Sequence, residues 1–205
     1  MSNAADSSIV EMLTRARAGD QQELGRLFAA CRSYLGIVAR AQMESWMRAK
    51  VDASDIVQDT LLEAHRDFAR FQGTTAAEWL AWLRGILANN AADIVRKYRG
   101  TEKRQTRREV SLRTPGDDSS VRGVPELADS IETPSIQLMR KERELRVADA
   151  MVGLSADYQE VIILRNLQRL PFDEVASRMG RSRPAVQMLW MRAIRKLQET
   201  LSGDV

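Results

Sequence analysis

The chain has 205 residues, of which 44% are hydrophobic, and this is enough for one large buried core or two small ones. Its 31 Lys and Arg residues nearly balance 28 Asp and Glu residues, so the net charge of +3 does not by itself indicate a partner. No apolar run approaches the roughly 20 residues that span a bilayer, no secretory signal pattern is present, and a single cysteine excludes an internal disulfide, so we expect a cytoplasmic protein.

Four helices are predicted in residues 1–100. Apolar residues at helical spacing form a first helix, and Asp20 with Glu23 three residues later forms a capping box that opens a second. A third helix is predicted to begin near Asp52 and a fourth near Thr75. Because this segment contains no credible strand pattern, we expect a first all-α domain.

Residues 101–135 are predicted to form a flexible linker, because helical periodicity gives way there to charged and turn residues such as Pro115 and Gly116. The helix before it is expected to end near Tyr98. Basic segments lie on both sides of an acidic stretch within the linker. This pattern is typical of a polyanion bound at two points, and solvated helix faces are the alternative interpretation.

A second all-α domain is predicted for residues 136–205, and it contains a helix-turn-helix pattern. Val175 faces inward on the first helix, Gly180 suits the turn, and Pro184 suits the first turn of the second helix. An ordinary helical hairpin is the alternative. The side chains that could contact base edges and phosphates are Arg181, Ser182, Arg183, Gln187, Met188, Met191 and Arg192.

Residues 154–197, from Leu154-Ser155 through the helix-turn-helix, resemble region 4 of sigma factors of the sigma-70 class. The first half resembles region 2 of the same family, through residues 52–61 and 79–90. Regions 1 and 3 of larger factors have no counterpart, so the resemblance is to the small extracytoplasmic-function group. It implies an RNA polymerase sigma factor that directs promoter recognition, promoter opening and transcription initiation.

The resemblance implies core RNA polymerase and promoter DNA as partners, and an anti-sigma factor is a further candidate. It implies that the third helix docks on the clamp coiled coil of the polymerase's largest subunit, that the loop around residues 71–75 receives a flipped base, and that the second domain contacts the −35 element. The implied polymerase-binding residues are Asp52, Asp55, Ile56, Gln58 and Asp59, although Asp52 also fits a helix cap. The implied −10 element residues are Asn89, Asn90, Asp93, Arg96, Lys97 and Arg99.

Two departures from the family leave the base preference open. Asp93 stands where some relatives have a neutral amide, and Gln187-Met188-Leu189 replaces a more basic segment of the recognition helix. The main alternative function is a helix-turn-helix regulator that does not enter the polymerase. An enzyme, a cofactor or a metal site is not expected, because the sequence lacks nucleophilic triads, metal-ligand spacing and phosphate-binding glycine loops.

Overall fold

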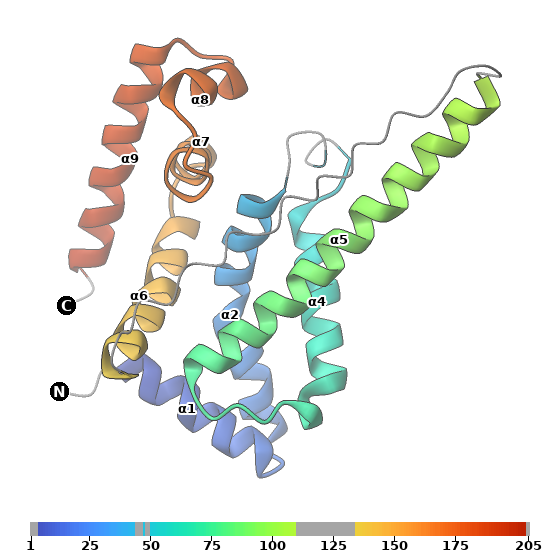
Figure 1. The fold of residues 1–205 in the computed structure, drawn as a ribbon. Coiled ribbons are helices and arrows are strands. Elements are labelled where there is room, and N and C mark those ends of the chain that lie inside the picture. Colours follow the sequence, from blue (N-terminus) through green and yellow to red (C-terminus); the bar gives the residue numbers. More distant parts are fainter. Residues whose placement is uncertain (1–3, 44–46, 48–49, 110–133, 204–205) are drawn as a thin grey trace.

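The structure is a computed structural model that describes residues 4–43, 47, 50–109 and 134–203. These residues form helices joined by short loops, and no strand occurs among them (Figure 1). The prediction of an all-α fold is therefore confirmed. The segment 110–133, which makes up most of the predicted linker, lies outside the described residues.

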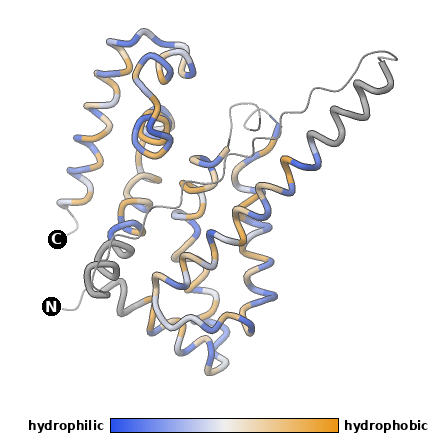
Figure 2. The backbone as a smooth tube through the Cα atoms, viewed as in Figure 1, coloured by the Kyte–Doolittle hydropathy of each residue, from blue (hydrophilic) through white to orange (hydrophobic). Residues whose placement is uncertain are grey.

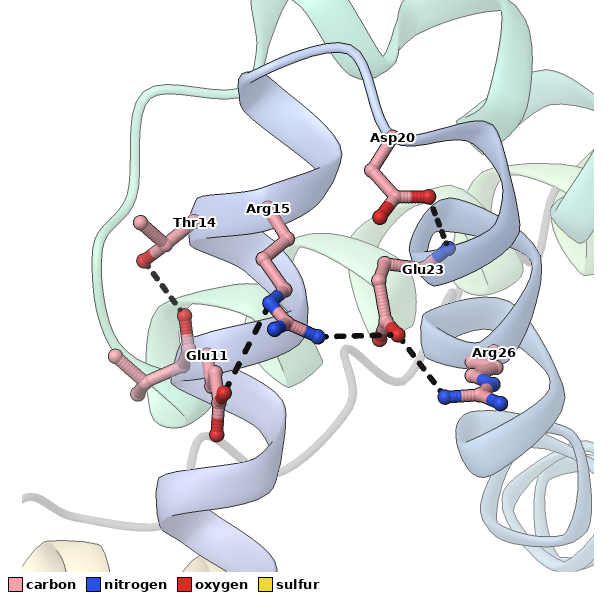
Figure 3. A network of polar contacts seen from close by, with 7 residues as sticks. Glu11, Thr14, Arg15, Asp20, Glu23 and Arg26 are labelled. Atoms are coloured by element: carbon pink, nitrogen blue, oxygen red, sulfur yellow. Dashed lines mark hydrogen bonds and ion pairs between the residues drawn. The ribbon is translucent and has the colours of Figure 1, made fainter.

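The first two helices form a hairpin. Helix α1 (Ala4–Arg17) and helix α2 (Gln21–Gln42) are joined by a turn at Gly19, whose φ of +98° suits a residue without a Cβ. The Asp20 carboxylate caps α2, as predicted, by accepting hydrogen bonds from two amides of its first turn. The Glu23 carboxylate does not complete the capping box. It pairs with Arg15 and Arg26 instead, as Figure 3 shows.

The next elements are α4 (Ala53–Asp67), the short 3₁₀ helix η1 (Phe68–Arg70) and α5 (Ala76–Glu109). Helix α5 begins directly after Thr75, in agreement with the sequence, but it continues 11 residues beyond the expected end near Tyr98. Only one glycine and no proline occur in this extension, and its many Lys, Arg, Glu and Gln residues favour a helix. The strong helix breakers come later in the sequence.

The core of the first half is built around Trp79 of α5, which is fully buried. Its indole N–H donates a hydrogen bond of 3.2 Å to the Cys31 Sγ atom on α2. The rings of Phe28, Phe68 and Phe71 pack around the indole at centroid distances of 5.4, 5.9 and 5.2 Å. This aromatic cluster fixes α2, η1 and α5 relative to one another.

The second half consists of α6 (Pro134–Val152), α7 (Ala156–Ile162), the π-helical turn η2 (Ile163–Leu167), α8 (Phe172–Met179) and α9 (Arg183–Gly203). Helices α8 and α9 form the predicted helix-turn-helix (Figure 1). Gly180 lies between them with a φ of +61°, the left-handed conformation that glycine adopts most easily.

The two halves contact each other through α6, which packs against α2 and α5. Figure 1 shows α6 beside α2, and Figure 2 shows hydrophobic residues on both helices. The Tyr34 hydroxyl on α2 lies 3.4 Å from a Glu144 carboxylate oxygen on α6, and the Gln168 amide donates to the Ala41 carbonyl at 3.0 Å. Polar contacts and buried apolar side chains therefore join regions far apart in the sequence.

Candidate functional site

Helix α4 presents one exposed stripe of polar side chains. Asp55, Gln58 and Asp59 are spaced by three and four residues, so they lie on the same face, and all three are exposed. Asp52 precedes this stripe and caps the helix by accepting a hydrogen bond of 2.9 Å from the Ser54 amide. That hydrogen bond lowers the pKa of Asp52 below its ordinary value.

Ile56 does not belong to this surface, because its side chain is fully buried. Ile56 lies on the opposite side of α4, as do Thr60 and Ala64, and these residues face the core. The next position on the exposed stripe is Leu62, whose residue surface is 54% exposed. Spacing alone could have indicated Leu62, since it follows Asp55 by seven residues.

Helix α5 carries the predicted −10 element residues beyond the aromatic cluster. Asn89 and Lys97 are exposed, and Asp93 forms an ion pair with Arg96 one turn later. Arg99 lies on α5, but its side chain is outside the described part of the chain. This face of α5 therefore combines the Asn89 amide, which can pair with a base edge, with the cations Arg96 and Lys97, which can pair with phosphates.

Asn90 has a different environment from its neighbour. It is half-buried, and its amide lies 3.3 Å from the Thr60 hydroxyl on α4, to which it can donate. The Thr60 hydroxyl in turn donates to the Ile56 carbonyl at 2.7 Å. Asn90 therefore joins α5 to α4 and holds these two helices in fixed register.

The loop at residues 71–75 connects η1 to α5 and lies over the aromatic cluster. The Phe71 ring stacks on Trp82 at 5.0 Å and 28°. Glu78 accepts hydrogen bonds from the Thr74 and Thr75 amides at 2.8 and 3.0 Å, and these bonds lower the pKa of the Glu78 carboxyl. The Glu78 amide in turn donates to the Thr75 hydroxyl at 3.2 Å, which completes a capping box at the predicted start of this helix.

The helix-turn-helix presents its second helix to solvent. Val175 of α8 and Val186 and Ala193 of α9 are buried, and α9 packs against both α7 and α8. Ser182 lies at the start of α9, with its hydroxyl 3.4 Å from the Ala185 amide, a position that suits a helix N-cap. Of the predicted −35 element residues, Gln187 is half-buried and the others are exposed: Arg181, Ser182, Arg183, Met188, Met191 and Arg192.

Two of these cations have acidic neighbours within the protein. Arg181 pairs with Asp157 of α7 at 2.6 Å, and Arg183 pairs with Asp173 of α8 at 3.3 Å. Arg192 has no ion pair with a described residue, and it lies one turn from Met188 on the exposed face of α9. Of these three cations, Arg192 is therefore the one that can pair with an anion without first breaking an ion pair with a described residue.

The described residues contain no grouping of three or more His, Cys, Asp or Glu side chains that could hold a metal ion. His65, the only histidine of the chain, is exposed on α4 and its ring lies 5.8 Å from that of Phe28. None of the described helices is long and apolar enough to cross a membrane.

Two family matches cover the two halves of the chain. The family described as Sigma-70 region 2 matches residues 21–101, and the family described as Sigma-70, region 4 matches residues 144–197. The ECF RNA polymerase sigma factor BldN of Streptomyces coelicolor is 31% identical over 98% of this chain and 70% of its own length. The chain belongs to the extracytoplasmic-function (ECF) group of the sigma-70 family. This ECF sigma factor acts in transcription initiation.

The chain is also similar to two further proteins. The probable RNA polymerase sigma factor RfaY of Xanthomonas campestris is 28% identical over 92% of this chain, and the chain spans 42% of that protein's length. A co-crystal structure of the sigma factor RpoE in complex with the anti-sigma factor NepR from Bartonella quintana is 26% identical, covers 90% of this chain and 98% of that chain, and has a TM-score of 0.30. Because the family matches include region 2, the alternative of a simple helix-turn-helix regulator is not favoured.

Proposed function

We propose that this ECF sigma factor binds core RNA polymerase through the exposed stripe of α4. The stripe places Asp55, Gln58, Asp59 and the apolar Leu62 on one helical face, and this combination suits a partner helix that carries cations around an apolar seam. The partner implied by the family is the clamp coiled coil of the largest subunit. Asp52 serves mainly as the cap that starts α4.

The proposal assigns promoter opening to α5 and the loop at residues 71–75. Asn89, Lys97 and the pair of Asp93 with Arg96 form a polar stripe for bases and phosphates of a melted −10 element. Arg99 continues this helix. Because Asn90 is hydrogen-bonded to Thr60, its part is to hold α5 on α4.

The proposal assigns duplex contact at the −35 element to α9. Arg183 and Arg192 can pair with guanine, Gln187 can pair with adenine, and Met188 can pack against a thymine methyl group. Arg181 and Ser182 lie at the start of the helix, where they suit phosphate contacts. The sigma factor then supplies binding energy that selects and distorts DNA, and the polymerase supplies all catalysis.

The observation that carries this proposal is the presence of three separate exposed polar surfaces, on α4, α5 and α9, within a chain that matches both regions of the family. Because core polymerase and the chromosome are in the bacterial cytoplasm, the proposal places the protein there. An anti-sigma factor that covers one of these surfaces is a further proposed partner.

Run-off transcription tests the proposal. Core polymerase is incubated with fragmented genomic DNA, with and without the protein, and the transcript starts are mapped. New starts that share two spaced sequence motifs are the expected result. Specific DNA retention without new starts would instead favour the helix-turn-helix regulator and would remove the polymerase from the list of partners.

A further inference from the structure

Arg17, the last residue of α1, binds the loop at residues 71–75. The Arg17 guanidinium donates hydrogen bonds to the Phe71 carbonyl at 3.0 Å and to the Gly73 carbonyl. Its central carbon lies 5.4 Å from the centroid of the Phe71 ring, within the range of a cation–π contact. A single side chain, 54 and 56 residues away in the sequence, therefore fixes two backbone carbonyls of this loop.

Arg17 and Glu78 bind different backbone groups of the same loop. Glu78 accepts from the amides of Thr74 and Thr75, whereas Arg17 donates to the carbonyls of Phe71 and Gly73. Charge-assisted hydrogen bonds of this kind are about twice as strong as neutral ones. The loop therefore has one defined conformation, although it contains no regular secondary structure.

The packing of Gly73 explains why this conformation has little freedom. A Cβ atom at Gly73 would lie 2.5 Å from the Phe71 ring and 2.7 Å from the Glu78 Cβ. The backbone of Gly73 thus rests directly on the Phe71 ring, which itself stacks on Trp82. The carbonyls of Phe71 and Gly73 and the amides of Thr74 and Thr75 are used internally, and the exposed side chains of Gln72 and Thr74 are groups that this loop can offer to a ligand.

We infer that Arg17 is a positioning residue for single-strand capture: it holds the loop at residues 71–75 in the shape that receives an unstacked base. This inference rests on the proposed function, which assigns the loop to the melted −10 element. Arg17 lies outside residues 21–101, the segment that matches region 2, so the match does not include it. Preorganised polar groups bind a base without the cost of ordering the loop at the moment of binding.

The test measures how much one base contributes to binding. Holoenzyme is assembled from core polymerase and the wild-type or variant sigma factor. Its affinity is measured for a fork-junction DNA built from a promoter that run-off mapping identifies. Each position of the unpaired −10 strand is replaced in turn by an abasic site, and the ratio of the intact to the abasic affinity gives the contribution of that base.

Arg17→Ala is expected to reduce the largest of these ratios about tenfold, because a misplaced binding group loses its contact with the base. Arg17→Lys is expected to lose nearly as much, since an ammonium lacks the planar two-donor geometry. Arg15→Ala is the matched control. This substitution removes a guanidinium from the same helix, but Arg15 contacts Glu11 and Glu23 and not the loop. The ratio of intact to abasic affinity for Arg15→Ala should therefore equal that of the wild type.

The outcomes separate the inference from the proposed function. Equal loss of affinity for intact and abasic strands in Arg17→Ala, or full recovery in Arg17→Lys, would show a general effect of charge or stability and would overturn the positioning role. No change in Arg17→Ala would overturn it as well. If the wild-type holoenzyme favours the intact strand at no position, the assignment of the loop to the −10 element fails, and the inference fails with it.

Discussion

Cys31 lies in the middle of the aromatic cluster, and burial raises the pKa of its thiol from 9.0 to about 12, despite the hydrogen bond from Trp79. The folded state therefore favours the neutral thiol more strongly than the unfolded state does. Because the unfolded chain loses its proton first, this stabilising effect is complete below about pH 9 and is lost as the pH rises toward 12. Burial raises the pKa of Tyr34 to about 12 as well, so alkaline pH acts on two core positions.

We therefore expect wild-type protein to lose on the order of 1–2 kcal/mol more stability than Cys31→Ala when the pH is raised from about 8 to about 10.5. Urea unfolding at the two pH values measures this difference. Tyr34 is present in both proteins, so its contribution cancels. The folded wild-type protein should also react slowly with a thiol reagent, and fast reaction at neutral pH would mean that Cys31 is accessible.

Ile56 and Leu62 lie on the same helix, but their substitution is expected to have different effects. Loss of the Ile56 side chain should lower folding stability, and loss of the Leu62 side chain should weaken polymerase binding. Ile56→Ala is expected to cost about 2–5 kcal/mol of folding stability, since it leaves a cavity in the core. Leu62→Ala should change stability by less than about 0.5 kcal/mol and weaken the binding of core polymerase. Fluorescence anisotropy of labelled sigma factor measures that affinity.

Val152→Ala is the control for Leu62→Ala, because Val152 is also an exposed apolar residue, at 51%, but lies on α6. An equal affinity for core polymerase in Leu62→Ala, Val152→Ala and wild type would remove Leu62 from the interface. Substitutions of Gln58 and Asp59 can be tested in the same binding assay, where they should weaken binding to core polymerase. The unfolding midpoint of these variants, measured separately, should equal that of the wild type.

Individual residues also show where sequence reasoning reaches its limit. Family resemblance gives the position of Ile56 in a docking helix, but only the helical register shows that its side chain faces the core. Arg17 carries no signal in the sequence, since its partners are backbone carbonyls 54 and 56 residues away. Trp79, by contrast, follows from apolar spacing alone, and the structure buries it.

At the level of elements, the turn of the helix-turn-helix requires a left-handed backbone conformation at Gly180. An L-amino acid with a Cβ is strained at a φ of +61°, although open space surrounds the position. We expect Gly180→Ala to destabilise the protein by about 1 kcal/mol. Gly25→Ala, inside α2 where nothing lies within 4 Å, should stabilise it by about 0.5–1 kcal/mol. Thermal unfolding compares the two, and shifts of the same sign would contradict this account.

Helices α5 and α9 are expected to act at different stages. Arg192→Ala should weaken binding to −35 duplex DNA by about 1–3 kcal/mol, because Arg192 is exposed and has no ion pair with a described residue. Asn89→Ala should leave duplex binding nearly unchanged and reduce promoter opening, measured as the permanganate reactivity of thymines in the −10 element. Equal loss of duplex affinity in both variants would contradict this division.

The element boundaries show which signals in the sequence are strong. The starts of α2, α4 and α5 follow from Asp20, Asp52 and Thr75, because a side-chain cap leaves a local pattern. The end of α5 has no such signal. Its extension to Glu109 follows from the absence of a strong breaker, and a charged segment without periodicity resembles a linker as much as a solvated helix.

For the whole molecule, the sequence predicts two modules joined by a linker, whereas the structure packs α6 of the second half against α2 and α5 of the first. Tyr34 lies at this junction, buried on α2, with its hydroxyl near Glu144 of α6, and Arg84 of α5 also acts on its pKa. Sequence patterns show that α6 has an apolar face. They do not show which distant helix covers that face.

We expect this junction to make the two halves stabilise each other. Tyr34→Ala, a substitution in the first half, should speed amide hydrogen exchange in α6 of the second half, because it leaves a cavity where α2, α5 and α6 meet. Val57→Ala is the matched control, since Val57 is equally buried in the first half but lies on α4, which packs against α2 and α5. If both variants speed exchange in α6 to the same extent, the halves are not coupled through Tyr34, and the contact between α2 and α6 has no special part in stability. A selective effect of Tyr34→Ala would mean that any partner that separates the halves must first overcome this junction.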